Sequence, residues 1–317
     1  MTNTASDITI RPLAGPEELG LFQQLSYVLD HEVADDLATG RRVPRWMWVA
    51  VRDGRVLARL AWWAAQHGDA PHSLDFFDVD DGLPAAERRA IGLRLLETAT
   101  AAVVPAGTPR PEYGRFVPGD WREDPAAREA VETRLNILTA SGATPLVERL
   151  RLEWRPGTPL AEPSGHLTFR PATDRAELLD LMTLVVEGSL DAHTREELRT
   201  MAPRESAELM YEEEFASYGS PRAWWRIAEL PDGGGPVGFV IPARNNYNAI
   251  IAYIGVLPAH RGHGHIDSIL AEGTRILAAQ DVPRIRAATD LPNVPMANAF
   301  TRAGYVVFER AINMIWK

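Results

Sequence analysis

The chain of 317 residues contains no cysteine. Without a thiol it cannot form a disulfide, a cysteine nucleophile or a cysteine-ligated zinc site. Basic residues are also in deficit, because 33 Lys and Arg stand against 43 Asp and Glu and the formal net charge is −10. General binding to nucleic acid needs clustered Lys and Arg that neutralise phosphates, so we expect no nucleic-acid partner.

Long apolar runs are missing as well. No stretch of the sequence reaches the roughly 18 uninterrupted apolar residues of a membrane-spanning helix. The first residues, MTNTASDITIRPL, lack the basic and apolar regions of a signal peptide. We therefore expect a cytoplasmic protein with no membrane partner.

Several catalytic and metal-binding patterns are absent. The sequence has no Walker motif and no Gly-x-Ser-x-Gly elbow, and His31-Glu32 lacks the second histidine of a zinc protease. The acidic cluster Asp75, Asp78, Asp80 and Asp81 does not have the spacing of a calcium loop. We therefore predict no metal site and interpret this cluster as a solvated strand end.

The sequence does contain a diverged internal repeat. Residues 10–12 (IRP) open the first half, and residues 169–171 (FRP) open the second. The halves also close alike, since 147–149 (VER) corresponds to 308–310 (FER) and a tryptophan follows in each. This self-similarity predicts two copies of one fold.

Turn residues divide each half and separate the two. Asp53-Gly54 and Asp232-Gly233 lie between alternating apolar segments, which is typical of hairpins. The segment Arg155–Gly165 is rich in Pro and Gly and has the composition of an interdomain connection. The predicted parts are a first domain over 1–156, a linker over 157–166 and a second domain over 167–317.

The second half alternates predicted strands and helices. Predicted strands lie at 167–172, 223–230, 236–243, 248–257 and 284–290, with a closing strand pair within 305–316. Predicted helices lie at 174–189, 264–279 and 295–303, with helical segments continuing to about 217. Interleaved strands and helices indicate a mixed sheet that helices cover.

A glycine turn joins the strand at 248–257 to the following helix. Its sequence is Ala-His-Arg-Gly-His-Gly-His over residues 259–265. Glycines allow the backbone N–H groups to converge on a ligand, and a helix N-terminus carries unpaired N–H groups with a positive dipole end. Arg261 adds a fixed positive charge, and His263 and His265 add donors. This pattern favours a pyrophosphate site, although a tight loop without a ligand has the same composition.

The order of these patterns resembles the GNAT (GCN5-related N-acetyltransferase) superfamily. Arg261 and Gly264 fit its first motif, whereas Ile266 stands where the family has a small residue. A second block follows after the next strand, with Asn293, Met296, Phe300, Gly304 and Tyr305 at the matching spacing. The resemblance covers about residues 167–317. Together with the internal repeat, it implies an α/β (α+β) protein of two tandem GNAT domains, each a mixed, mostly antiparallel sheet flanked by helices.

The resemblance also implies acetyl-CoA as the cofactor. The strand before the turn would offer backbone groups to the pantetheine arm, and the turn would bind the pyrophosphate. The implied cofactor-binding residues are Ile254, Gly255, Val256, Arg261, Gly262, His263, Gly264, His265, Ile266, Asn293, Met296 and Phe300.

The usual proton donor of the family is missing from this sequence. Many relatives have a tyrosine at the position of Phe300 that protonates the departing CoA thiolate, and a phenyl ring cannot do so. Tyr253 and Tyr305 are the candidate catalytic residues, although either could be a core aromatic. Glu212, Glu213 and Glu214 could approach the acceptor or form a solvated face.

The first half lacks the features of a cofactor loop. The segment aligned with the turn begins Asp80-Asp81-Gly82, without the glycine pair or the arginine, and its acids would repel a pyrophosphate. We therefore predict a degenerate GNAT-like first domain that binds no CoA.

The leading hypothesis is an N-acetyltransferase that moves an acetyl group from acetyl-CoA to a primary amine of a small molecule. The alternatives are a non-catalytic acyl-CoA-binding or regulatory module and an acetyltransferase of protein amines. We expect a monomer or a homodimer.

Overall fold

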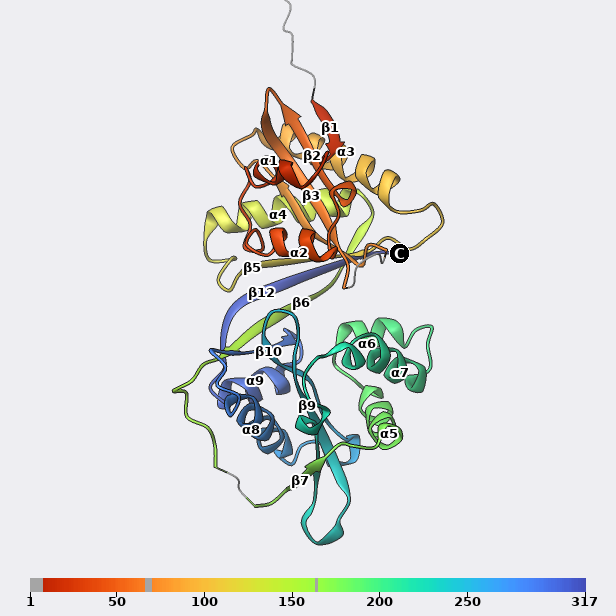
Figure 1. The fold of residues 1–317 in the computed structure, drawn as a ribbon, viewed down its shortest axis with the longest axis vertical. Helices are drawn as coiled ribbons and strands as arrows, with labels where there is room; N and C mark the ends of the chain where they lie inside the picture. The colour runs from red at the N-terminus through yellow and green to blue at the C-terminus, as the bar shows by residue number, and fades with distance from the viewer. Residues whose placement is uncertain (1–7, 66–69, 163–164) are drawn as a thin grey trace, which may run out of the picture. The chain divides into compact units, whose positions relative to one another are not determined.

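The computed structural model describes residues 8–65, 70–162 and 165–317 (Figure 1). The chain forms two compact units, of which the first comprises Met1–Val147 with Ala311–Lys317 and the second comprises Glu148–Arg310. The boundaries of these units differ from those of the predicted domains, 1–156 and 167–317. The difference arises because the final strand of each half, β6 (Ala143–Trp154) or β12 (Val306–Trp316), begins in one unit and ends in the other.

The first unit is a mixed sheet with helices. Its strand order is β1-β2-β3-β4-β5, followed by the last part of β12 and the first part of β6. Strands β1 to β4 pair antiparallel in sequence, whereas β4 and β5 pair in parallel. The strands are β1 (Thr9–Pro12), β2 (Met47–Arg52), β3 (Arg55–Trp63), β4 (Ser73–Val79) and β5 (Glu112–Pro118). The helices are α1 (Leu19–Phe22), α2 (Val33–Thr39), α3 (Ala85–Val103) and α4 (Pro125–Ala140).

The hairpin predicted at Asp53-Gly54 joins β2 to β3. Both residues have left-handed backbone angles, with φ of 52° at Asp53 and 76° at Gly54. Positive φ at both central residues matches the twist of the paired strands, which explains why this dipeptide marks the turn.

The second unit repeats this plan. Its strand order is β6-β11-β10-β9-β8-β7, with the first part of β12 beside β6. The strands are β7 (Thr168–Pro171), β8 (Arg226–Glu229), β9 (Pro236–Arg244), β10 (Ala249–Val256) and β11 (Ile285–Asp290). The helices are α5 (Arg175–Val186), α6 (Ala192–Glu197), α7 (Pro203–Glu213), α8 (His265–Ala278) and α9 (Val294–Arg302).

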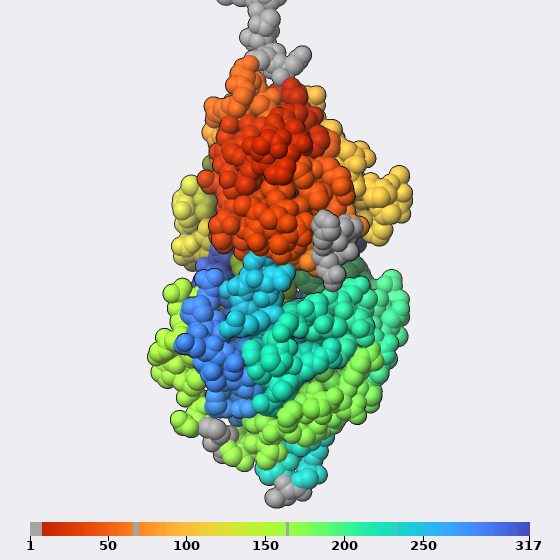
Figure 2. Space-filling model, viewed as in Figure 1, coloured from red at the N-terminus to blue at the C-terminus, as the bar shows by residue number. Residues whose placement is uncertain are grey.

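Helices cover both faces of the second sheet (Figure 1). Alternate residues of β9 point to opposite faces, so Val240 packs with α8 and α9 while Phe239 and Ile241 pack with α5 and α7. Figure 2 shows α5 to α7, coloured green, over much of the visible face of this unit. The mixed, mostly antiparallel sheet with flanking helices is the predicted fold class.

One predicted element is wrong. The segment predicted as a closing strand pair is the single strand β12. The sequence from Val306 to Trp316 contains neither Gly nor Pro, so nothing reverses the chain and the alternating pattern continues as one long strand.

Two neighbouring strands of the second unit pair only at their beginnings. The parallel pairing of β10 with β11 is confined to Ala249 with Ile285 and Ile250 with Arg286. A register shift between Ile251 and Tyr253 follows in the pairing of β10 with β9. A β-bulge of this kind bends and twists a strand, and here it coincides with the end of the β10–β11 pairing.

Candidate active site

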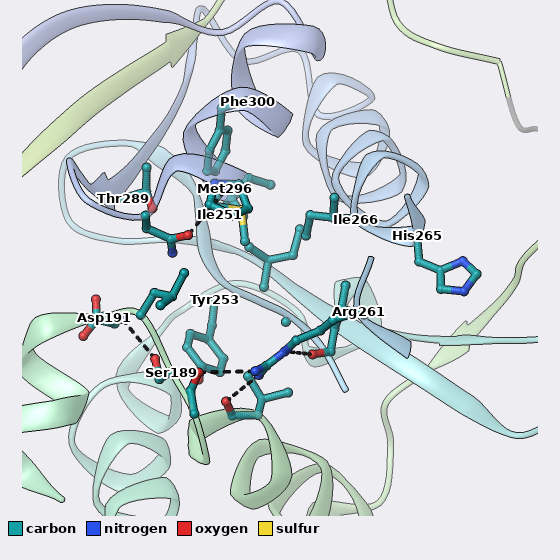
Figure 3. Close-up of a pocket in the computed structure, with 18 of the residues that line it drawn as sticks. Ser189, Asp191, Ile251, Tyr253, Arg261, His265, Ile266, Thr289, Met296 and Phe300 are labelled. Atoms are coloured by element: carbon teal, nitrogen blue, oxygen red, sulfur yellow. Dashed lines mark hydrogen bonds between the residues drawn. The ribbon is translucent and has the colours of Figure 1, made fainter. Parts of the chain in front are cut away.

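A pocket of about 430 Å³ lies where β10 and β11 separate (Figure 3). Its walls are formed by β6, β10, β11, the turn after β10, the end of α5 with the α5–α6 loop, the start of α8, and the first two turns of α9. Every residue that lines it belongs to the second unit. All of the predicted cofactor residues except His263 line this pocket, as does Tyr253, whereas Tyr305 does not.

The inner edge of β10 directs peptide groups at the pocket. The Leu257 N–H donates to Val237 O at 2.8 Å, which fixes the alternation of hydrogen-bonded pairs along β9 and β10. By that alternation the peptide groups of Gly255 face β9, and those of Ile254 and Val256 face the side from which β11 has separated. Their N–H groups are therefore positioned for an extended polar ligand.

Gly255 has a packing role that the sequence did not indicate. A Cβ added there would lie 2.6 Å from Val185 Cγ1, so α5 packs directly against the backbone of β10. Any larger residue would push α5 away and open the pocket wall. Gly255 thus allows α5 to lie close to β10, and this close packing forms one wall of the pocket.

The glycine turn has the backbone conformation of an anion site. Gly262 and Gly264 have φ of +83° and +77°, and no atom lies within 4 Å of a Cβ built on either. The positive φ therefore requires glycine, and the space beside the turn is open. Gly264 is also the N-cap of α8 and makes no side-chain capping bond. The Asp267 N–H donates to Gly264 O at 3.2 Å, so the N–H groups of His265 and Ile266 remain available to an anion.

Arg261 holds the turn in place. Its guanidinium donates to Val256 O at 3.2 Å, Gly188 O at 3.3 Å and Val185 O at 3.1 Å. These carbonyls include the end of α5, where the helix dipole is negative. Arg261 was predicted to contact pyrophosphate, but in this structure its hydrogen bonds connect the turn to α5.

The histidines of the turn form a cluster with His166. The ring of His265 lies 5.8 Å from the rings of His263 and His166 and 6.3 Å from that of His260. Burial, together with repulsion from these three rings, lowers the pKa of His265. His265 therefore adds little positive charge at neutral pH.

Helix α9 and its N-cap contribute one polar residue, Asn293, and three apolar residues to the pocket. Asn293 is the N-cap and accepts a hydrogen bond from Met296 N–H at 3.4 Å. Phe300 is 1% exposed and lies edge-on to Tyr305, with ring centroids 5.0 Å apart. The predicted second block thus forms a wall that is mainly apolar.

The structure separates the two candidate catalytic tyrosines. Tyr305 is 3% exposed and its hydroxyl lies 2.8 Å from Thr274 Oγ1, which makes it a core residue. Tyr253 lines the pocket, and its ring packs 5.5 Å from Phe239 and 5.8 Å from Phe215. Burial, and then the charge of Asp191, raises the pKa of Tyr253, so its hydroxyl stays protonated at neutral pH.

Sequence reasoning missed a polar group on the opposite wall. Asp191 lies in the α5–α6 loop, and Arg149 comes from β6, outside the predicted second domain. Arg149 Nε lies 3.0 Å from Asp290 Oδ1, and Arg149 NH2 lies 3.7 Å from Asp191 Oδ2. The strand register that brings β6 beside β11 had no signal in the sequence.

The predicted acidic candidates lie outside the pocket lining, although the charges of Arg149 and Asp191 affect the pKa of Glu214. None of Glu212, Glu213 and Glu214 lines the pocket. Glu212 pairs with Arg175 on the surface, and Glu214 accepts a hydrogen bond from the Tyr218 hydroxyl.

The acidic cluster of the first unit is not a solvated strand end. Asp78 is 1% exposed and lies 2.9 Å from Arg59 Nε and 2.8 Å from Arg115 NH2. Asp75 pairs with the buried Arg42. The prediction was wrong for these two residues, because arginines distant in the sequence supply the partners that buried carboxylates need. Among the described residues, no group of His, Cys, Asp and Glu could hold a metal ion.

Residues 190–305 match the acetyltransferase (GNAT) family. No curated protein matches the chain in sequence. No helix of the described residues combines the length and apolar character needed to cross a bilayer.

Solved structures share the fold over nearly the whole chain. A GCN5-related N-acetyltransferase from Sphaerobacter thermophilus has a TM-score of 0.60 at 14% identity, and the match covers 97% of this chain and 95% of that one. A tandem GNAT protein from the clavulanic acid biosynthesis pathway has a TM-score of 0.55 at 16% identity, with 98% of each chain covered. A GCN5-related glucosamine N-acetyltransferase region in a fungal multi-domain β-N-acetylglucosaminidase has a TM-score of 0.59 at 12% identity, with 98% of this chain and 38% of that one covered. At these identities the likeness shows the fold alone.

Proposed function

We propose, from the premise that residues 190–305 form a domain of the acetyltransferase (GNAT) family, that the chain transfers an acetyl group from acetyl-CoA to a primary amine of a small molecule. Members of this family use acyl-CoA donors. The main support for the proposal is that one pocket is lined by a glycine turn, by the N-terminus of α8, which has no side-chain cap, and by the peptide groups of β10 that face away from β9.

The pocket residues fit a CoA thioester along its length. The turn at Gly262 and Gly264 with the start of α8 suits a diphosphate, because converging N–H groups stabilise negative charge. The slot between β10 and α9 is lined by apolar side chains such as Met296 and Phe300 and by the polar edge of β10, which suits a pantetheine arm with its amides. When bound, acetyl-CoA would supply a thioester whose acyl carbon forms a bond to the amine nitrogen as the bond to sulfur breaks, with one proton lost from the nitrogen and one gained by the sulfur.

We assign the proton donor for the departing sulfur to Tyr253. Phe300 has no proton to give, and Tyr305 is engaged with Thr274 in the core. Tyr253 lines the same pocket, and its hydroxyl is protonated at neutral pH. A proton donor held in the pocket lowers the barrier to departure of the thiolate.

The first unit, on this proposal, binds no CoA. Its β4 and β5 also pair only at their beginnings, at Ser73 with Glu112 and Leu74 with Tyr113. Beyond these pairs, Asp78 at the end of β4 and Arg115 of β5 form a buried ion pair 2.8 Å long. Charged side chains of the chain itself thus lie where the second unit has its pocket.

The test is release of CoA thiol from acetyl-CoA in the presence of a panel of primary amines. Gly264→Glu should lower CoA affinity by about 100-fold or more, equivalent to about 3 kcal/mol, because it adds strain and a negative charge to the anion site. Gly54→Glu is the matched control, since Gly54 also has a positive φ of +76° and open space at Cβ but lies in the hairpin of the first unit.

Two results would contradict the proposal. Calorimetry that detects no binding of any CoA species would remove the cofactor assignment. Tight CoA binding with no thiol release for any amine would instead favour a non-catalytic acyl-CoA-binding module, which the missing hydroxyl at Phe300 also permits.

A further inference from the structure

We propose that Asp191 selects an acceptor with a second cationic group beside the amine that is acetylated, such as a short α,ω-diamine. This inference rests on the proposed function, because it names the acceptor class of the same pocket. It assigns to Asp191 a role in binding and orientation and not in proton transfer.

Asp191 lies at the end of the pocket away from the glycine turn. Figure 3 shows Asp191, Ser189 and Thr289 on one side and His265 and Ile266 on the other, with Tyr253 between them. Asp191 is the only carboxylate among the residues that line this pocket. A group that enters opposite the pyrophosphate end therefore meets this negative charge.

One oxygen of Asp191 is occupied and the other is available. Oδ1 accepts hydrogen bonds from Thr194 N–H at 2.9 Å and from Thr194 Oγ1 at 3.1 Å, which caps α6. Oδ2 lies 3.7 Å from Arg149 NH2, which is too long for a hydrogen bond. The side chain is 31% exposed, so a ligand in the pocket can reach this oxygen.

Asp290 compensates the charge of Arg149. Asp290 is 1% exposed, its Oδ1 lies 3.0 Å from Arg149 Nε, and its Oδ2 accepts a hydrogen bond from Ala192 N–H at 2.6 Å. Asp290 Oδ1 and Arg149 Nε are thus the two ends of one buried ion pair, although their geometry is not that of a hydrogen bond. One guanidinium therefore faces two carboxylates, and the three groups together carry one net negative charge.

The chemistry of Asp191 favours holding a cation over accepting its proton. Burial alone would raise the pKa of Asp191, but the charge of Arg149 and the hydrogen bonds from Thr194 lower it overall. A carboxylate of lowered pKa does not deprotonate an alkylammonium, which ionises near pH 10. The amine that attacks the acyl carbon must be neutral, so the ammonium that stays on Asp191 is a second group of the acceptor.

The test is calorimetric titration of the full chain, with CoA present, by α,ω-diamines and by monoamines of equal chain length. Wild type should bind the best diamine at least about 10-fold more tightly than its matched monoamine. Asp191→Asn should abolish this preference, because Asn keeps the oxygen that caps α6 and removes only the charge. Thr194→Ala is the control, since it removes a hydrogen bond to Oδ1 and leaves the charge, and it should retain the preference.

The inference is overturned if wild type does not distinguish the matched amines or if Asp191→Asn keeps the preference. Thiol release is measured separately, so the two proposals can fail independently. Diamine binding that depends on Asp191 without any thiol release would refute the acetyltransferase activity and leave the acceptor-site assignment standing. Equal acetylation of diamine and monoamine would refute the assignment and leave the activity standing.

Discussion

Tyr253 and Tyr305 were equal candidates in the sequence, and their surroundings distinguish them. Both lie in a unit rich in aromatic contacts, but only Tyr253 lines the pocket. The Tyr305 hydroxyl is paired with Thr274 inside the core. On our proposal, the hydroxyl that Phe300 lacks is therefore supplied by Tyr253 of β10 and not by Tyr305, which follows α9.

Replacement of Tyr253 by Phe should lower kcat by about 100-fold with little change in the KM for acetyl-CoA, because a proton donor acts in the transition state. Steady-state kinetics with the best amine of the panel measures this. Tyr305→Phe is the matched control, which should cost about 1 kcal/mol of stability through the lost hydrogen bond and leave kcat unchanged. Equal loss of kcat in both variants would contradict the assignment.

The pH dependence of kcat provides a second check on Tyr253. A proton donor is active below its pKa and inactive above it. Because the folded protein raises the pKa of Tyr253 above the ordinary value of about 10, kcat should not fall as the pH rises through that value. A pH–rate profile of wild type, recorded while circular dichroism shows that the fold is intact, measures this. A decline in kcat centred near pH 10 that is absent in Tyr253→Phe would show an unshifted tyrosine.

Strand β6 belongs to the first half of the sequence repeat but contributes to the core and the pocket of the second unit. It closes the first half of the repeat, yet Leu150, Leu152 and Trp154 belong to the core cluster of the second unit with Ile285 and Phe300. It also supplies Arg149 to the pocket. The second unit therefore depends on a strand that lies before the predicted linker.

Replacement of Leu152, which is 1% exposed, by Ala should destabilise the second unit by about 2 to 5 kcal/mol through the cavity it leaves. Denaturant unfolding with and without CoA measures this, because a bound ligand stabilises the unit that holds it. Leu138→Ala makes the same truncation at a residue that is 0% exposed in the core of the first unit. CoA should raise the denaturant midpoint of the transition in which the second unit unfolds. If Leu138→Ala, and not Leu152→Ala, lowered this midpoint, the assignment of Leu152 in β6 to the core of the second unit would be wrong.

The whole molecule consists of two units of one plan with different interiors at corresponding places. In the second unit, the ends of β10 and β11 enclose a pocket. In the first unit, Asp78 and Arg115 pair there, and Arg59 lies 2.9 Å from the other oxygen of Asp78. Burial would raise the pKa of Asp78, but the charges of Arg115, Arg59 and Arg134 lower it overall, which keeps this network ionised.

Calorimetric titration of the full chain should therefore give one CoA per chain. Hydrogen exchange should show CoA-dependent protection of amides around 260–266 and none around 80–90, because only the former combine a glycine turn with an uncapped helix N-terminus. A stoichiometry of two, or equal protection of both segments, would show that the first unit also binds the cofactor.

Periodicity and turn chemistry placed most local elements of the second unit. The strand predicted at 248–257 is Ala249–Val256, and the helix predicted at 264–279 is His265–Ala278. The alternation of apolar and polar residues in a strand and their helical period depend on neighbouring residues alone, so a single sequence is enough to predict them. The long β12 was predicted as a strand pair, although the segment Val306–Trp316 contains no Gly or Pro that would reverse the chain.

The sequence by itself determined the glycine turn and the short motifs whose recurrence shows the internal repeat, since each motif consists of residues close together along the chain. The resemblance that these motifs carry implied the fold class. Only the tertiary structure decided that Tyr253 faces the pocket, that Arg261 holds α5, and that Arg149 from β6 lies beside Asp191. These relations join residues far apart in sequence, and strand register and helix packing set them. No local pattern encodes that register, because it is fixed by the burial of many side chains together.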